Sequence, residues 1–192
     1  EITPVEFWNK YVGSADLDSY VCLVDDPRKE HAKGTKIGIE HLGNVAGGDP
    51  TEYLNVPIEF MKDCVRTILV EQGIPVWFGA DCHPMMDRQD GAWATDLFEY
   101  GEVYGVEFDM DKEQRVRFAD SAMNHAMAFV GVDLDDDGTT TRRWRVENSW
   151  GTKIADKGYF TMADDWFDQY VFEVAVPEAM LPEKYRKALG EP

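Results

Sequence analysis

The chain has 192 residues, 44% of them apolar and 12% aromatic, which is enough to bury the core of one domain. Its formal net charge of −18 argues against nucleic-acid binding, because contact with phosphates depends on clustered lysine and arginine. No apolar run reaches the roughly 20 residues that a membrane helix needs. Three widely spaced cysteines without a C-x-x-C pair indicate a reducing, cytoplasmic compartment rather than a disulfide framework.

The first 50 residues are expected to form a short helix and then an irregular extension that packs on the core. The sequence T-P-V-E at residues 3–6 combines a capping box with a proline at the first helical position, and it predicts a helix over residues 4–12. The segment from Gly34 to Pro50 starts like a strand and ends in a glycine-rich turn. Because it has neither the G-x-G-x-x-G pattern nor a P-loop lysine, we interpret it as a connection.

Residues 51–192 are expected to form a lobe that is rich in strands. Asn55 is a candidate cap for a helix, and Gly73 is placed to end it. The apolar residues of this helix follow helical spacing, and they are Ile58, Met61, Val65, Ile68 and Leu69. Residues 74–79 then have the composition of a buried strand with a proline near its start, and residues 81–96 that of a polar loop.

A short helix capped by Asp111 is expected before the densest strand region of the chain. The predicted strands cover residues 125–132, 141–147, 157–162 and 171–176. Turns are expected at residues 135–138 and 151–156, a helical turn at 164–170, and a terminal helix at 177–189. Strands joined in this way most simply form an antiparallel sheet.

A histidine and an asparagine at the edges of two adjacent predicted strands are the candidate catalytic residues. His125 starts one strand, and Asn148 follows the next strand within the sequence N-S-W-G. A general base needs an imidazole held in one tautomer, and an amide oxygen can hold it without adding charge. Trp150 is placed to cover the bond between them and to keep water from competing for it. In a Cys/His peptidase, His125 would take the thiol proton and later protonate the leaving amine.

The sequence resembles the family of bleomycin hydrolase and aminopeptidase C, the cytosolic branch of the papain-like cysteine peptidases. The matching segments are C-L-V-D-D-P-R from residue 22, V-W-F-G from 76, H-A-M from 125, W-R-V-E-N-S-W-G from 144, K-G-Y from 157 and D-W-F from 165. The N-S-W-G segment is typical of papain-like peptidases in general. The flanking R-V-E and the distant C-L-V-D-D-P-R point to this branch.

The resemblance implies an α+β, papain-like fold, of which this chain is the antiparallel-sheet, half-barrel lobe with peripheral helices. It assigns His125 as the catalytic base, Asn148 as its orienting partner and Trp150 as their shield. By a weaker analogy Asn124 lines the floor of the substrate cleft, with a plain loop residue as the alternative. The resemblance also implies removal of residues from peptide amino termini and a homohexameric assembly. We expect neither a metal nor a cofactor.

One part of the family's pattern is absent from the sequence. The nucleophilic cysteine of the family lies in a Gln-x-x-x-x-x-Cys-Trp segment at the head of a helix, and no such segment occurs here. The chain is therefore expected to be the carboxy-terminal half of a cysteine aminopeptidase that is inactive without the amino-terminal lobe carrying the nucleophile. A catalytically silent module that binds peptides or a partner is the alternative. A face that meets a missing lobe should be unusually apolar.

Within the chain, Cys82 beside His83 is the closest alternative nucleophile. It follows a predicted strand, and too little chain separates it from His125 for a helical lobe between them. We interpret Cys82 as a loop or core thiol, and Cys22 and Cys64 as small buried apolar groups.

Two patterns that look like metal sites do not meet the requirements of one. Asp81-Cys82-His83 has no second pair of residues at zinc-ligand spacing. The D-x-D-x-D-G pattern from Asp133 copies half of an EF-hand loop, but Trp144 occupies the position of the bidentate glutamate, so a hairpin turn is predicted. The remaining histidines are expected to be surface or structural residues: His31, His41 and His83.

Overall fold

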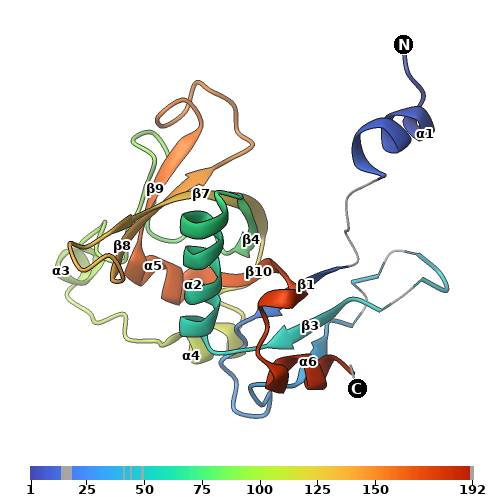
Figure 1. Cartoon of the computed structure of the whole chain (residues 1–192). Coiled ribbons are helices and arrows are strands. Elements are labelled where there is room, and N and C mark those ends of the chain that lie inside the picture. Colours follow the sequence, from blue (N-terminus) through green and yellow to red (C-terminus); the bar gives the residue numbers. More distant parts are fainter. Residues whose placement is uncertain (14–18, 41, 44, 49, 191–192) are drawn as a thin grey trace.

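The computed structural model describes residues 1–13, 19–40, 42–43, 45–48 and 50–190, and Figure 1 shows how their elements are arranged. These residues form a ten-stranded sheet in the order β2-β3-β1-β10-β4-β7-β8-β9-β6-β5. Neighbouring strands are antiparallel except for the pairs β1 with β3 and β6 with β9. The antiparallel arrangement predicted for the strands after residue 125 is confirmed. No helix of the described part is long and apolar enough to span a membrane.

The five predicted strands lie in the middle of the sheet. They are β4 (Val76–Ala80), β7 (His125–Leu134), β8 (Thr141–Glu147), β9 (Tyr159–Ala163) and β10 (Val171–Pro177). Strand β8 has the predicted bounds because its side chains alternate: Trp144 and Val146 are buried, whereas Arg143 and Arg145 are exposed. Such alternation marks a strand with one face on the core.

The edges of the sheet contain strands that the sequence patterns do not predict. These are β1 (Tyr20–Val24), β3 (Glu52–Asn55), β5 (Met86–Asp87) and β6 (Ala92–Trp93), while β2 (Lys36–Gly38) coincides with the possible strand after Gly34. Residues 81–96 were expected to be a loop, and this is wrong for β5 and β6. Trp93 is buried and stacks on Phe160 with 4.6 Å between ring centroids, which holds β6 beside β9.

The helices largely follow the prediction. The predicted helix at residues 4–12 is confirmed as α1 (Pro4–Phe7) and the π-helical turn η1 (Trp8–Val12), with the capping box present. Helix α2 (Ile58–Thr67) continues as η3 (Ile68–Gln72), packs against β10 and ends at Gly73, which has the left-handed φ of 65° (Figure 1). Helix α3 (Tyr100–Tyr104) is not among the predicted elements. Helices α4 (Lys112–Arg117) and α5 (Asp164–Tyr170) lie where they were expected.

The predicted terminal helix at residues 177–189 is wrong in one respect, because it is broken. A short 3-10 turn, η4 (Glu178–Met180), is followed by α6 (Glu183–Leu189). Leu181 between them is extended, with φ −74° and ψ 132°. Pro182 accounts for the break, because a proline disfavours helical backbone in the residue before it and has no N–H to donate.

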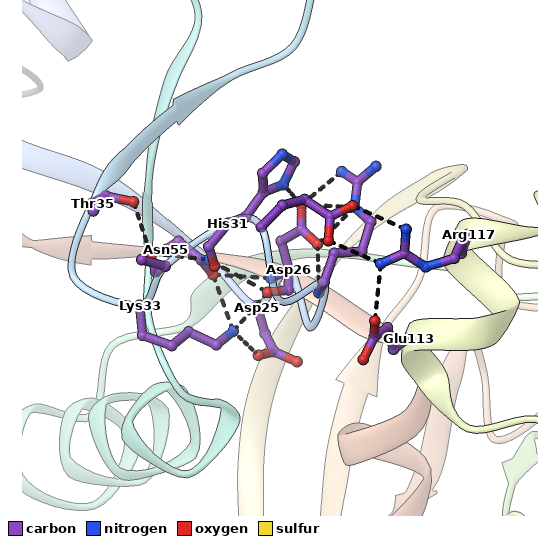
Figure 2. A network of polar contacts seen from close by, with 11 residues as sticks. Asp25, Asp26, His31, Lys33, Thr35, Asn55, Glu113 and Arg117 are labelled. Carbon is purple, nitrogen blue, oxygen red and sulfur yellow. Dashed lines mark hydrogen bonds and ion pairs between the residues drawn. The ribbon is translucent and has the colours of Figure 1, made fainter.

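Asn55 does not cap helix α2, contrary to the prediction, and Pro57 occupies the cap position. Asn55 ends β3, is fully buried, and holds the loop that follows β1 (Figure 2). Its Oδ1 accepts from the backbone N–H of Asp26 and from Lys33 Nζ, both at 3.0 Å, and its Nδ2 donates to the His31 carbonyl at 2.9 Å. The Asn55 side-chain amide is thus bound to the loop after β1 and does not cap helix α2.

The two acidic residues of the same loop are each paired with cations. Asp25 binds Lys33 and, at 2.8 Å, the buried Lys112 of α4, whose pKa is lowered by burial against the opposing effect of Asp25. Burial alone would raise the pKa of the Asp26 carboxyl, but hydrogen bonds from Arg28 and His31 hold it below the usual range. The loop is thus tied to β3 and to α4 by buried polar groups that have partners.

Replacement of Asn55 by alanine should therefore destabilise the fold, because it leaves the Asp26 N–H and the His31 carbonyl without the hydrogen bonds that Asn55 provides. We expect Asn55→Ala to lower the free energy of unfolding by about 2–4 kcal/mol, measured by urea denaturation. Asn9→Ala on the exposed η1 is the matched control and should change it by less than about 0.5 kcal/mol. Equal values for the two variants would contradict this account of the loop.

Candidate active site

His125 lies where β7 enters the sheet, opposite Ala80 at the end of β4. The residue before it, Asn124, fixes this corner. The Asn124 backbone N–H donates to the Ala80 carbonyl at 3.0 Å, its Nδ2 donates to Asp81 Oδ1 at 2.6 Å, and its Oδ1 accepts from the Cys82 N–H at 3.1 Å. Asn124 thus lies beside His125, with its amide bound to the end of β4, and a role in the cleft floor stays a prediction.

Asn148 lies where β8 leaves the sheet. Its backbone N–H donates to the Gly158 carbonyl at 3.1 Å, and the residue is only 8% exposed. The turn that follows needs glycine, because Gly151 and Gly158 have φ angles of 83° and 94°. The N-S-W-G sequence therefore ends the strand, provides the amide and reverses the chain.

The structure brings His125 and Asn148 together, with 2.9 Å between His125 Nε2 and Asn148 Oδ1. The same Oδ1 accepts from the backbone N–H of Ser149 at 2.8 Å. Because a backbone N–H can only donate, the Asn148 atom that meets both groups is the oxygen. His125 Nε2 therefore carries a hydrogen, and the lone pair of the neutral ring is on Nδ1. Within the described residues Nδ1 has no hydrogen-bond partner, so it is available as a base.

Trp150 lies against the imidazole, as its place in the sequence predicts. Its ring stacks on that of His125 at 5.2 Å between centroids and 24° between planes. Phe160 meets the indole edge-on at 5.7 Å, and the Arg88 guanidinium lies 4.9 Å from it. This packing restricts the imidazole, and the shielding of its bond to Asn148 stays a prediction.

Cys82 is buried in the core, and its thiol lies 3.9 Å from His83 Nδ1. Among the described residues no hydrogen bond joins this thiol to His125. Burial raises the pKa of the Cys82 thiol, and the charge of Asp81 adds to this effect. A thiol with a raised pKa forms little thiolate at neutral pH and is a poor nucleophile. The interpretation of Cys82 as a core thiol agrees with this environment.

The described residues contain no group of three or more histidine, cysteine or acidic side chains arranged to hold a metal ion. The EF-hand-like segment is the predicted hairpin turn, in which the Gly138 N–H donates to the Asp135 carbonyl at 2.9 Å. His31 binds Asp26 in the loop network, His83 is exposed beside Cys82, and His41 lies outside the described residues.

Sequence reasoning missed Asp81, which hydrogen-bonds to Asn124, the residue before His125. Besides Asn124, it accepts from Ser121 Oγ at 2.8 Å, and both Asp81 and Ser121 are buried. An acidic residue directly after a predicted buried strand was the available signal, since a buried carboxylate needs partners nearby.

A model of the Peptidase C1-like family matches residues 1–192. The chain belongs to this family. Aminopeptidase C of Lactobacillus delbrueckii subsp. lactis is 39% identical over 100% of this chain, and bleomycin hydrolase of Homo sapiens is 39% identical over 99%. The crystal structure of pepw from Lactobacillus rhamnosis HN001 matches 99% of the chain with a TM-score of 0.92 and 37% identity.

These comparisons confirm the predicted papain-like fold and the homology to cysteine aminopeptidases. The chain covers 42% of each of these three proteins, so it spans less than half of their length. Within the chain itself, the described residues hold no cysteine hydrogen-bonded to His125.

The Asn148 amide should fix the tautomer of His125. In the 192-residue chain at a pH where the ring is neutral, ¹⁵N NMR should find the hydrogen on Nε2. Asn148→Ala should give a mixture of tautomers, whereas Asn124→Ala should leave the Nε2–H form in place. A single Nδ1–H form in the unaltered chain would contradict the assignment of the base.

The two buried thiols, those of Cys64 and Cys82, should be almost unreactive in the folded chain. The pKa of Cys64 is raised to about 12 by burial and then by the Asp63 charge, so its thiolate fraction falls steadily as pH drops below that value. At pH 8, alkylation of Cys64 and Cys82 by iodoacetamide should be at least about a hundredfold slower than in urea, as followed by peptide mass spectrometry. Fast labelling of native Cys82 would reinstate it as a candidate nucleophile.

Proposed function

We propose that this chain is the histidine- and asparagine-bearing half of a cysteine aminopeptidase, with peptides as substrates and a cytoplasmic location. The observation that carries the proposal is the bond between His125 and Asn148, with the tautomer fixed by Ser149 and Nδ1 left free. A nucleophile supplied by an amino-terminal lobe would complete the site. Membership of the Peptidase C1-like family and homology to the aminopeptidases support this reading.

The chemistry follows from the free Nδ1. It takes the proton from the cysteine thiol, and the resulting thiolate is stabilised by the imidazolium beside it. The thiolate attacks the carbonyl carbon of the first peptide bond, and the imidazolium returns the proton to the leaving amine. Water, activated by the same nitrogen, then hydrolyses the thioester and regenerates the thiol. Asn148 keeps Nε2–H engaged throughout, and Trp150 restricts access of water to that bond.

Exposed apolar side chains support a role for a second lobe or further subunits. The helix formed by α1 and η1 has an apolar stripe but no buried residue. A second group lies on residues 98–110, where Val103 is 74% and Phe108 is 69% exposed. Patches of this kind mark contacts with other protein surfaces. We assign them to the amino-terminal half and to a homohexameric assembly like that expected of the family.

The chain alone should hydrolyse no aminoacyl fluorogenic substrate, whereas a polypeptide that joins it to a cysteine-bearing amino-terminal lobe should. In the joined protein, His125→Ala should lower kcat/KM by at least about a thousandfold, and Asn148→Ala by a smaller factor, because the base remains but loses its orientation. His83→Ala is the matched histidine control and should leave the rate unchanged.

Two results would overturn the proposal. Thiol-reagent-sensitive turnover by the chain alone would place the nucleophile within these 192 residues. A reading frame without a cysteine-bearing helix segment upstream of Glu1 would favour the silent peptide- or partner-binding module instead.

A further inference from the structure

Arg88 lies in the turn between β5 and β6, which is held beside the candidate site. The Gly91 carbonyl of this turn accepts from the backbone N–H of Thr161 in β9 at 2.8 Å. A Cβ at Gly91 would lie 2.3 Å from the Ala155 Cβ, so the turn also packs closely on the segment that joins β8 to β9. That segment contains Trp150, and the turn therefore places Arg88 next to the candidate site.

The Arg88 guanidinium contacts the indole that packs on the candidate base. It lies over the Trp150 ring, 4.9 Å from the centroid, and the same indole stacks on the His125 imidazole at 5.2 Å. Contact of a guanidinium with an aromatic ring is favourable, and it leaves the N–H groups at the edge of the guanidinium free to donate. The arginine, the indole and the imidazole thus form one continuous series of contacts.

Arg88 has no carboxylate partner within the described part of the chain. Other arginines, such as Arg28, Arg117 and Arg145, form ion pairs with acidic residues. The Asp87 carboxylate, which is the nearest in sequence, instead accepts from the backbone N–H groups of residues 89 and 90, both at 2.9 Å. Because Arg88 is exposed, its charge and its N–H groups are accessible to a ligand.

The ligand that best fits such a guanidinium is a carboxylate, because its two oxygens match the planar donors. The two stacking distances together place the guanidinium within about 10 Å of the imidazole, which an extended peptide covers in about three residues. The residue that an aminopeptidase removes carries an ammonium group, which a guanidinium repels. The carboxylate is therefore expected in the part of the peptide that is released.

We propose that Arg88 is a specificity-determining residue that binds a carboxylate in the released part of the peptide. This carboxylate is either the terminal one of a short peptide or an acidic side chain near the cleaved bond. The inference rests on the proposed function for the ligand being a peptide, but not on the presence of the nucleophile. The net charge of −18 makes such a preference diagnostic, because the acidic chain as a whole attracts cations and repels anions.

The test is a set of NMR titrations of the 192-residue chain, followed at the indole N–H of Trp150. Tri-alanine and tri-alanine amide differ only in the terminal carboxylate, and Ala-Glu-Ala amide and Ala-Gln-Ala amide differ only in a side-chain carboxylate. We expect the carboxylate-bearing member of at least one pair to bind at least about fivefold more tightly. Arg88→Gln should remove this preference and leave the binding of the member without the carboxylate unchanged.

Two further variants separate charge from geometry and from general electrostatics. Arg88→Lys should retain part of the preference, because lysine keeps the charge but not the planar donors. Arg186→Gln is the matched control, since Arg186 is exposed on α6 and has no ion pair among the described residues. This control should keep the whole preference.

A preference in the first pair identifies the terminal carboxylate as the ligand, and one in the second pair identifies an acidic side chain. No binding of any peptide, equal binding within both pairs, or a preference that survives Arg88→Gln would overturn the inference. So would weaker binding of tri-alanine amide to Arg88→Gln, since Arg88 would then only support the indole. Because binding requires no cysteine, an inactive joined protein would contradict the peptidase proposal without affecting this measurement.

Discussion

The pairing of β7 with β4 on one side and β8 on the other is the constraint on which the site depends. Ala80 at the end of β4 lies opposite His125, and Glu147 at the end of β8 lies opposite Ala128. One strand thus enters the sheet close to where its neighbour leaves it, and the imidazole and the amide meet at that edge. A slip of one residue would turn every side chain of a strand to the other face, so the same register that buries the core also forms the site.

Buried polar groups hold the ends of these strands, where backbone pairing stops. Asp81 binds Ser121 and Asn124, which precede His125 in the chain, and Asn55 joins β3 to the loop after β1. Each of these groups has hydrogen-bond partners, so the desolvation cost of burying it is largely offset. These bonds fix loop segments that apolar packing alone would leave poorly defined.

The free Nδ1 of His125 links structure to function. Asn148 Oδ1 engages Nε2, and no described residue hydrogen-bonds Nδ1. Because one ring nitrogen is held and the other is free, the imidazole is suited to move a proton. His125 shares its face of β7 with the buried Met127 and Phe129, whereas Ala126 points to the other face of the sheet.

The sequence by itself determined the central strands, most helices, the family, and the two residues that meet at the candidate site, His125 and Asn148. The alternating apolar and polar residues of β8, the capping box at Thr3 and the N-S-W-G segment are local signals, and local backbone preferences act on them directly. Asn124 and Trp150 were located by the same signals, although their roles stay proposals.

The tertiary structure alone decided the use of Asn55, the edge strands and the partners of the buried acids. Strands such as β1 and β6 are short, and partners distant in the chain stabilise them, so no local pattern marks them. The proline that breaks the terminal helix was visible, but the packing of its two parts was not. Only the folded chain shows how the buried acids are paired. Arg28 and Lys33 lie in the same loop as Asp25 and Asp26, but Lys112, the buried partner of Asp25, comes from α4, 87 residues along the chain.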